Sequence, residues 1–237
     1  MARVIKIDNS LKKRFSYKKQ KKNTKKDLVA YFLIVCEGEK TEPNYFRSFP
    51  KKVGKIVYDI EFDGGGISTL KVVEKAIELR DKSKQKYDRV WAVFDKDSFK
   101  SNSFNSAILK ANSNNIQCAW SNEAFELWYL LHFHNRTTAM NREDYKQALE
   151  VAINSKIKSK RTQFKYEKNN PNMFLILQKY GDQKQAINWA RKLNENFDGK
   201  KFSEFNPATQ VFKLVEELNG KSEVLNDEIE DKYTLGK

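Results

Sequence analysis

The chain contains little cysteine and little histidine, with two of each among 237 residues. Cys36 and Cys118 lie far apart, each in an apolar run, so a disulfide framework and a cysteine-based zinc site are excluded. We interpret both as small buried hydrophobic residues of a reducing compartment. No segment has the ~20 consecutive apolar residues of a membrane-spanning helix, and the basic N-terminus lacks the apolar stretch of a signal peptide. We therefore expect a cytoplasmic protein with no membrane partner.

Positive charge is abundant and unevenly distributed. The net charge is +14, and residues 1–26 hold eleven Lys and Arg against the single acid Asp8, so +10 lies in this segment. We predict a flexible basic arm that grips the phosphates of DNA or RNA, although a solvated tail that aids solubility is an open alternative. The arm residues predicted to contact nucleic acid are Lys12, Lys13, Arg14, Lys18, Lys19, Lys21 and Lys22.

The lysines at 51, 52, 55 and 156–168 are predicted to extend this basic field. Within the polar loop at 161–170, Arg161 and Lys165 are the residues predicted to contact nucleic acid. The loop also contains Phe164 and Tyr166, which could stack on bases or anchor the loop to the core.

Apolar runs that alternate with amphipathic segments predict an α/β domain with a mainly parallel central sheet. Strands are expected at 28–36, 55–62, 87–97 and 116–121, with helices between them. After Ser121 the pattern is helical, beginning with a buried helix at 123–133 and ending with a helix capped by Asn206 and stopped by Gly220. We predict an arm at 1–26, an α/β core at 27–135, a helical part packed on it at 136–220, and a loose tail at 221–237.

Acidic side chains follow two of the predicted strands. Glu37 comes directly after the strand at 28–36, and Asp95 and Asp97 end the strand at 87–97 on one side of the extended chain. Ligands of open α/β sheets bind beyond the carboxyl ends of the strands, and three converging carboxylates need a cation. Mg²⁺ or Mn²⁺ is the natural partner of such oxygen ligands, although acids at strand ends also serve as simple turn formers.

Glu126 lies within the almost wholly apolar helix at 123–133, so its carboxylate must be paired or metal-bound. We consider a salt bridge, a surface position, or a role as a ligand or support of the acidic cluster. Ser121 and Asn122 suggest a helix cap or support for the cluster, and His132 is a weaker candidate for the same role.

Four segments together resemble the RloB-like family of the Toprim superfamily, which is linked to bacterial restriction and phage-defence loci. They are CEGEKTEPNYF, VWAVFDKD, WSNEAFELWYLLHF and NPATQVFKLVEEL, and the resemblance covers residues from about 28 to 220. It implies a Toprim-like Rossmannoid fold that acts on phosphodiesters with magnesium, with Glu37, Asp95 and Asp97 as its acidic residues. Likeness to OLD-type nucleases implies that Glu42 is also a metal ligand. No topoisomerase-type tyrosine motif and no separate zinc or helicase domain is found, which disfavours a topoisomerase or a replicative primase.

The leading hypothesis is a metal-dependent nuclease. Glu37, Asp95 and Asp97 would hold one Mg²⁺ or Mn²⁺, and Glu42 and Glu126 would complete a second site. Lys40 would either steady a phosphate oxygen or be a solvated lysine of the loop. One alternative is a non-catalytic nucleic-acid-binding subunit of a defence complex, and another is a basic α/β protein whose acids only cap turns. Another defence-locus protein is a possible partner, and the apolar segment 121–133 could pack either in the core or in a homodimer.

Overall fold

The computed structural model describes residues 27–97, 100–158, 163–195, 199 and 201–235. The predicted basic arm at 1–26 and Arg161 lie outside the described residues. Within the described part of the chain, no helix is both long enough and apolar enough to cross a membrane.

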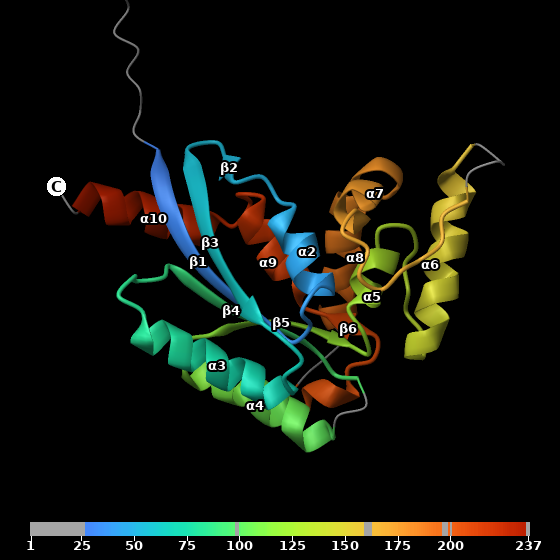
Figure 1. Cartoon of the computed structure of the whole chain (residues 1–237), viewed down its shortest axis with the longest axis horizontal. Coiled ribbons are helices and arrows are strands. Elements are labelled where there is room, and N and C mark those ends of the chain that lie inside the picture. Colours follow the sequence, from blue (N-terminus) through green and yellow to red (C-terminus); the bar gives the residue numbers. More distant parts are fainter. Residues whose placement is uncertain (1–26, 98–99, 159–162, 196–198, 200, 236–237) are drawn as a thin grey trace, which may run out of the picture.

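A six-stranded sheet forms the centre of the molecule, in the order β2-β3-β1-β4-β5-β6 (Figure 1). The pairs β1–β3, β1–β4 and β4–β5 are parallel, and the two edge pairs are antiparallel. The mainly parallel sheet predicted from the sequence is therefore confirmed. The strands are β1 (Leu28–Cys36), β2 (Lys52–Val53), β3 (Ile56–Gly64), β4 (Arg89–Asp95), β5 (Gln117–Asn122) and β6 (Ala208–Thr209).

Helices cover both faces of the sheet, which explains why β1 is an almost continuous apolar run. Residues 32–36 of β1 are fully buried, with alternate side chains in the two apolar cores. Helices α3 and α4 pack on one face, and most of the others lie on the opposite face (Figure 1). The helices are α2 (Thr41–Arg47), α3 (Thr69–Lys82), α4 (Ser101–Ser113), α5 (Glu126–Leu130), α6 (Arg142–Lys156), α7 (Met173–Tyr180), α8 (Gln183–Glu195), α9 (Val211–Leu218) and α10 (Glu223–Leu235), with a 3-10 turn at Phe202–Glu204.

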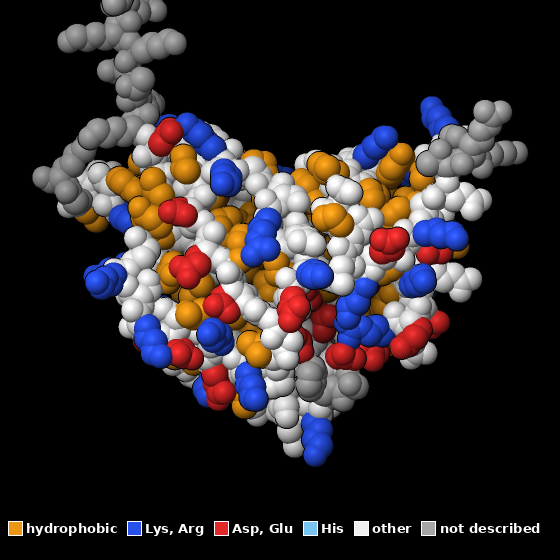
Figure 2. Space-filling model, in the orientation of Figure 1, with side chains coloured by type: hydrophobic (Ala, Val, Ile, Leu, Met, Phe, Trp, Pro, Cys, Tyr) orange, Lys and Arg blue, Asp and Glu red, His pale blue; other side chains and the backbone are white. Residues whose placement is uncertain are grey.

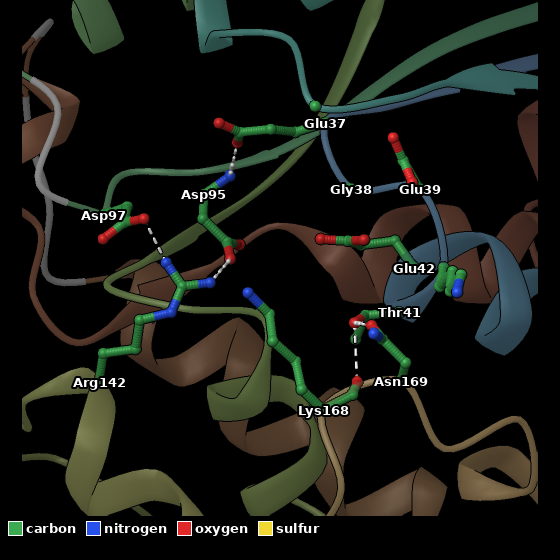
Figure 3. Close-up of a pocket in the computed structure, with 12 residues that line it drawn as sticks. Glu37, Gly38, Glu39, Thr41, Glu42, Asp95, Asp97, Arg142, Lys168 and Asn169 are labelled. Atoms are coloured by element: carbon green, nitrogen blue, oxygen red, sulfur yellow. Dashed lines mark hydrogen bonds and ion pairs between the residues drawn. The ribbon is translucent and has the colours of Figure 1, made fainter.

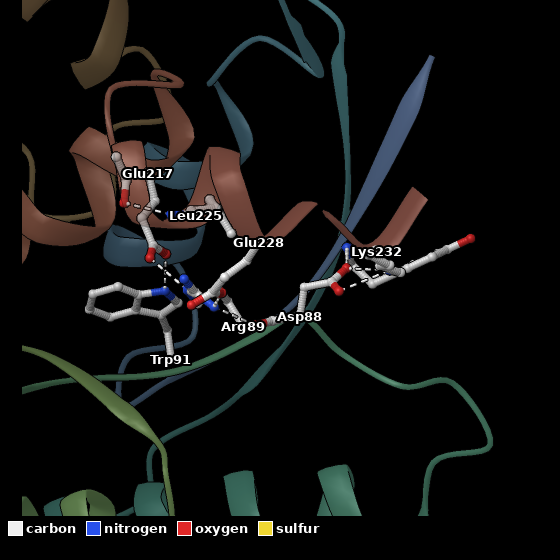
Figure 4. Close-up of polar contacts among 9 residues, drawn as sticks. Asp88, Arg89, Trp91, Glu217, Leu225, Glu228 and Lys232 are labelled. Carbon is white, nitrogen blue, oxygen red and sulfur yellow. Dashed lines mark hydrogen bonds and ion pairs between the residues drawn. The ribbon is translucent and has the colours of Figure 1, made fainter. Parts of the chain in front are cut away.

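The loose tail predicted at 221–237 is wrong for the described residues, because α10 packs against the sheet. Leu225 and Ile229 are buried, and the Tyr233 hydroxyl is bonded to the backbone of Val29 in β1. Figure 4 shows how α9 and α10 also bring acidic side chains onto Arg89 at the start of β4. The C-terminal helix therefore completes one face of the domain.

The junction after β5 also differs from the prediction. Asn206 does not cap a helix, because Ala208–Thr209 pairs with β5 as the edge strand β6, and α9 begins only at Val211. Nor do Ser121 and Asn122 cap a helix, because both belong to β5. Of the helix predicted at 123–133, only Glu126–Leu130 is helical, as α5, and the flanking residues form turns. The buried side chains of this segment pack in the core rather than forming a dimer surface.

Candidate active site at the carboxyl ends of two strands

The predicted strand-end acids meet because β1 and β4 are parallel neighbours. Cys36 lies opposite Val93, so the two strands finish at the same edge of the sheet. The Glu37 carboxylate accepts a hydrogen bond of 3.0 Å from the backbone N–H of Asp95. In both segments an apolar strand is followed by an acid, and the parallel pairing of the strands places the two carboxylates side by side.

Asp95 and Asp97 both face the same pocket, as the alternation of side chains predicts. Asp95 is buried, and its Oδ2 accepts a bond of 3.1 Å from the backbone N–H of Phe125. Asp97 has a φ of +42°, a conformation that Asp tolerates better than most residues. Between them, Lys96 turns away and donates to the Asp97 carbonyl at 3.2 Å.

These acids line a pocket of about 380 Å³, shown in Figure 3. Figure 2 shows acidic and basic side chains side by side near the middle of one face of the molecule. The lining residues are Glu37, Gly38, Glu39, Lys40, Thr41, Glu42, Gly66, Asp95, Asp97, Arg142, Lys168 and Asn169. Five acids thus oppose three bases, which leaves two negative charges in excess when all are ionised.

Arg142 is a site residue that the sequence did not reveal. It is the first residue of α6, and its guanidinium is paired with Asp97 Oδ2 and lies 3.7 Å from Asp95 Oδ2 (Figure 3). An arginine at the start of an amphipathic helix resembles an ordinary solvated residue, and only the tertiary fold brings it to the acids.

Lys168 is the second base beside the acids, and the sequence predicted it only as part of a basic field and not as a residue of this pocket. The Thr41 hydroxyl donates to the Lys168 carbonyl at 2.8 Å, which fastens the 163–170 loop to the start of α2. The Lys168 side chain extends toward the carboxylates of Asp95 and Glu42 (Figure 3). The basic character of this loop was predicted, but not which of its lysines reaches the acids.

Glu42 is buried at the start of α2, and its Oε2 has no hydrogen-bond partner among the described residues. The side chain leans over Gly38, where an added Cβ would lie 2.3 Å from that same oxygen. A buried carboxylate oxygen without a partner is costly. Glycine at position 38 therefore makes room for a carboxylate whose Oε2 has no hydrogen-bond partner among the described residues.

Burial dominates the electrostatics of the acids. It raises the pKa of Glu37 to about 7, an effect partly opposed by the bond from Asp95. Burial and then the charges of Glu42 and Glu126 raise the pKa of Asp95, and burial and then Glu126 raise that of Glu42. The pocket therefore resists full ionisation unless a cation enters.

The donor set fits a hard divalent cation, because its side chains present carboxylate oxygens and carry an excess negative charge. Glu42 supplies an unpartnered buried oxygen, which is a second sign of fit. As the side chains stand, however, no three Asp, Glu, His or Cys residues of the described ranges are grouped as a metal site. Arg142 is bound to both aspartates instead.

Glu126 lies behind the pocket and does not line it. Its Oε1 accepts a 2.6 Å bond from the hydroxyl of Tyr166, and both side chains are buried. Tyr166 is thus an anchor of its loop rather than a platform for stacking bases. Of the two basic residues predicted in this loop, Lys165 is described, and it is exposed.

The other predicted supporting residues are placed as follows. The Ser121 carbonyl accepts from the backbone of Lys96 at 2.8 Å and so helps to fix the segment between the two aspartates. Asn122 donates to the Ser203 carbonyl at 3.0 Å, away from the acids.

His132 is buried against Trp128, and burial lowers its pKa to about 4, so it is a structural residue outside the pocket. Lys40 is exposed at the pocket rim.

Comparison with known proteins gives one match. The family model described as RloB-like protein matches residues 32–218, which include every strand-end acid and Arg142. No curated protein and no solved structure matches the chain. Since the match covers well over half of the sequence, the chain belongs to the RloB-like family.

Proposed function

We propose that this protein is a metal-dependent nuclease that hydrolyses phosphodiester bonds of nucleic acid, in the cytoplasm and in defence against phage. The observation that carries the proposal is the convergence of Glu37, Glu42, Asp95 and Asp97 on one pocket at the carboxyl ends of parallel strands. The resemblance to the Toprim superfamily supports the same chemistry. The family's link to phage-defence loci supports the biological role and a partner protein from the same locus.

Glu37, Asp95 and Asp97 would hold one Mg²⁺ or Mn²⁺, and Glu42 would contribute to a second. When bound, the metal activates water and stabilises the charge that develops on the phosphate. Glu126 orients the pocket wall through Tyr166 rather than reaching the substrate. In the overall reaction, water adds to phosphorus and one P–O bond breaks, giving a phosphomonoester and a free hydroxyl.

The bases of the pocket hold the substrate in this proposal. Arg142 and Lys168 approach the acids from two different elements, α6 and the 163–170 loop, so a phosphate group can be gripped between them. Lys40 at the rim and the exposed Lys165 add to the positive field, as would the basic arm.

A cleavage assay tests the proposal. Purified full-length protein would be incubated with Mg²⁺ or Mn²⁺ and labelled single-stranded DNA, double-stranded DNA, total RNA and tRNA. Glu37→Ala and Asp95→Ala serve as inactive controls, and Lys146→Gln on the exposed side of α6 serves as the matched active control. We expect metal-dependent cutting by wild type and Lys146→Gln alone. Equal cutting by the two acid variants would assign the activity to a contaminant.

A second candidate is a nucleic-acid-binding subunit that does not cut. The contact that favours it is the pairing of Arg142 with both aspartates, which gives these acids a counter-charge without a metal. This candidate predicts tight, salt-sensitive binding and no cleavage of any substrate in the assay above.

A further inference from the structure

Arg142 occupies an unusual place for a cation. It begins α6, at the positive end of the helix dipole, where a basic side chain is disfavoured. Its side chain is only 27% exposed, so it is also partly desolvated. Both costs are offset by its contacts with Asp95 and Asp97, which indicates that the arginine serves the acidic pocket rather than the helix.

The oxygens that Arg142 contacts are those that a metal would need. The guanidinium is bonded to Asp97 Oδ2 and lies 3.7 Å from Asp95 Oδ2. These two carboxylates project into one pocket, Asp95 from the last residue of β4 and Asp97 from two residues beyond it. A divalent cation and a guanidinium repel each other, so both cannot share the same oxygens at close range.

Arg142 alone does not balance the negative charge of the pocket or give every buried carboxylate oxygen a partner. Glu42 is 7% exposed, and its Oε2 has no partner among the described residues. When all five lining acids are ionised, two negative charges remain in excess after the three lining bases are counted. A divalent cation would supply the charge that is missing, and it would do so at the expense of the arginine contact.

The displaced guanidinium would remain inside the pocket, because α6 fixes its backbone there. Its planar fork of donors matches the oxygens of a phosphate group better than any other side chain does. Resting on the function proposed above, we propose that Arg142 exchanges partners: it is the internal counter-ion of Asp95 and Asp97 without metal, and when a divalent cation binds it turns to the substrate phosphate.

Two titrations test the exchange on full-length protein. The first measures Mn²⁺ binding by calorimetry for wild type, Arg142→Gln, Arg142→Lys and Lys146→Gln. The second measures inorganic phosphate binding at saturating Mn²⁺ for the same proteins. Lys146 is the matched control, because the same charge is removed from an exposed position of the same helix. Circular dichroism and thermal unfolding establish that each variant is folded.

We expect Arg142→Gln to bind Mn²⁺ about tenfold more tightly than wild type, equivalent to about 1.4 kcal/mol. The same variant should bind phosphate about tenfold more weakly, Arg142→Lys should lie between, and Lys146→Gln should match wild type. Equal or weaker Mn²⁺ binding by a folded Arg142→Gln would overturn the exchange while leaving the nuclease proposal intact. Absence of Mn²⁺ binding from all four proteins would overturn both.

Discussion

A buried polar network at the far end of the sheet gives a quantitative prediction for stability. Glu217 of α9 accepts 2.7 Å and 2.9 Å hydrogen bonds from Arg89 and from the indole N–H of Trp91 (Figure 4). Trp91 is fully buried, and the Arg89 side chain is only 13% exposed. Glu217→Ala would leave both donors without this acceptor, although Arg89 keeps its 2.6 Å contact with Glu228.

The magnitude follows from the two donors. A buried donor left without a partner costs about 1–3 kcal/mol, and the broken buried ion pair places the total at about 3 kcal/mol. For a protein of this size, each kcal/mol lowers the melting temperature by about 2–4 °C, so we expect a decrease of about 6–12 °C. Thermal unfolding followed by circular dichroism measures it.

Two control variants sharpen the test. Glu217→Gln keeps one acceptor oxygen and should lie between Glu217→Ala and wild type. Glu78→Ala breaks an exposed pair with Lys82 on α3 and should leave the melting temperature unchanged. A decrease of less than about 2 °C for Glu217→Ala would refute the reasoning, because it would mean that the network contributes little.

Three further predictions concern the pocket and the C-terminal helix. The pKa of Glu37 is raised from 4.5 to about 7, so the folded state binds more protons than the unfolded state over this range. Metal-free protein should therefore lose about 2 kcal/mol of stability, allowing for partial exposure, between about pH 5 and pH 7.5. Urea unfolding should show a smaller loss for Glu37→Gln, and an identical pH dependence in both proteins would contradict this. Gly38→Ala should displace the Glu42 carboxylate and weaken Mn²⁺ binding with little change in melting temperature, since only a side-chain end must move; undiminished Mn²⁺ affinity would count against it. Truncation after Gly220 removes two fully buried side chains of α10 and should cost at least ~3 kcal/mol in urea unfolding; an unchanged midpoint would show that α10 is dispensable.

The parts of this fold that local pattern encodes could be predicted from the sequence. The run from Leu28 to Cys36 is apolar because both faces of β1 are covered, and its end is marked by an acid. The same logic places Asp95 at the end of β4. Because β1 and β4 are parallel neighbours, their carboxyl ends lie at the same edge of the sheet and the acids come together. The structure confirms this through the hydrogen bond from the backbone N–H of Asp95 to the Glu37 carboxylate.

The remaining features depend on contacts between distant segments. Arg142 and Lys168 resemble solvated surface residues in the sequence, and only the packing of α6 and the 163–170 loop turns them to the acids. The edge strand β6 has two residues, too few to show a period. The helix α10 did leave a signal, since Leu225, Ile229 and Tyr233 recur every fourth residue, but its many charges resemble those of a solvated tail.

The central claim is that the strand-end carboxylates form one divalent cation site. Crystals of the full-length protein soaked in Mn²⁺ and measured at the manganese absorption edge test it most directly. We predict an anomalous peak in the pocket, about 2.1 Å from carboxylate oxygens of Asp95 and Asp97, with Arg142 turned away. Manganese peaks only outside the pocket, with Arg142 still paired to both aspartates, would contradict the account.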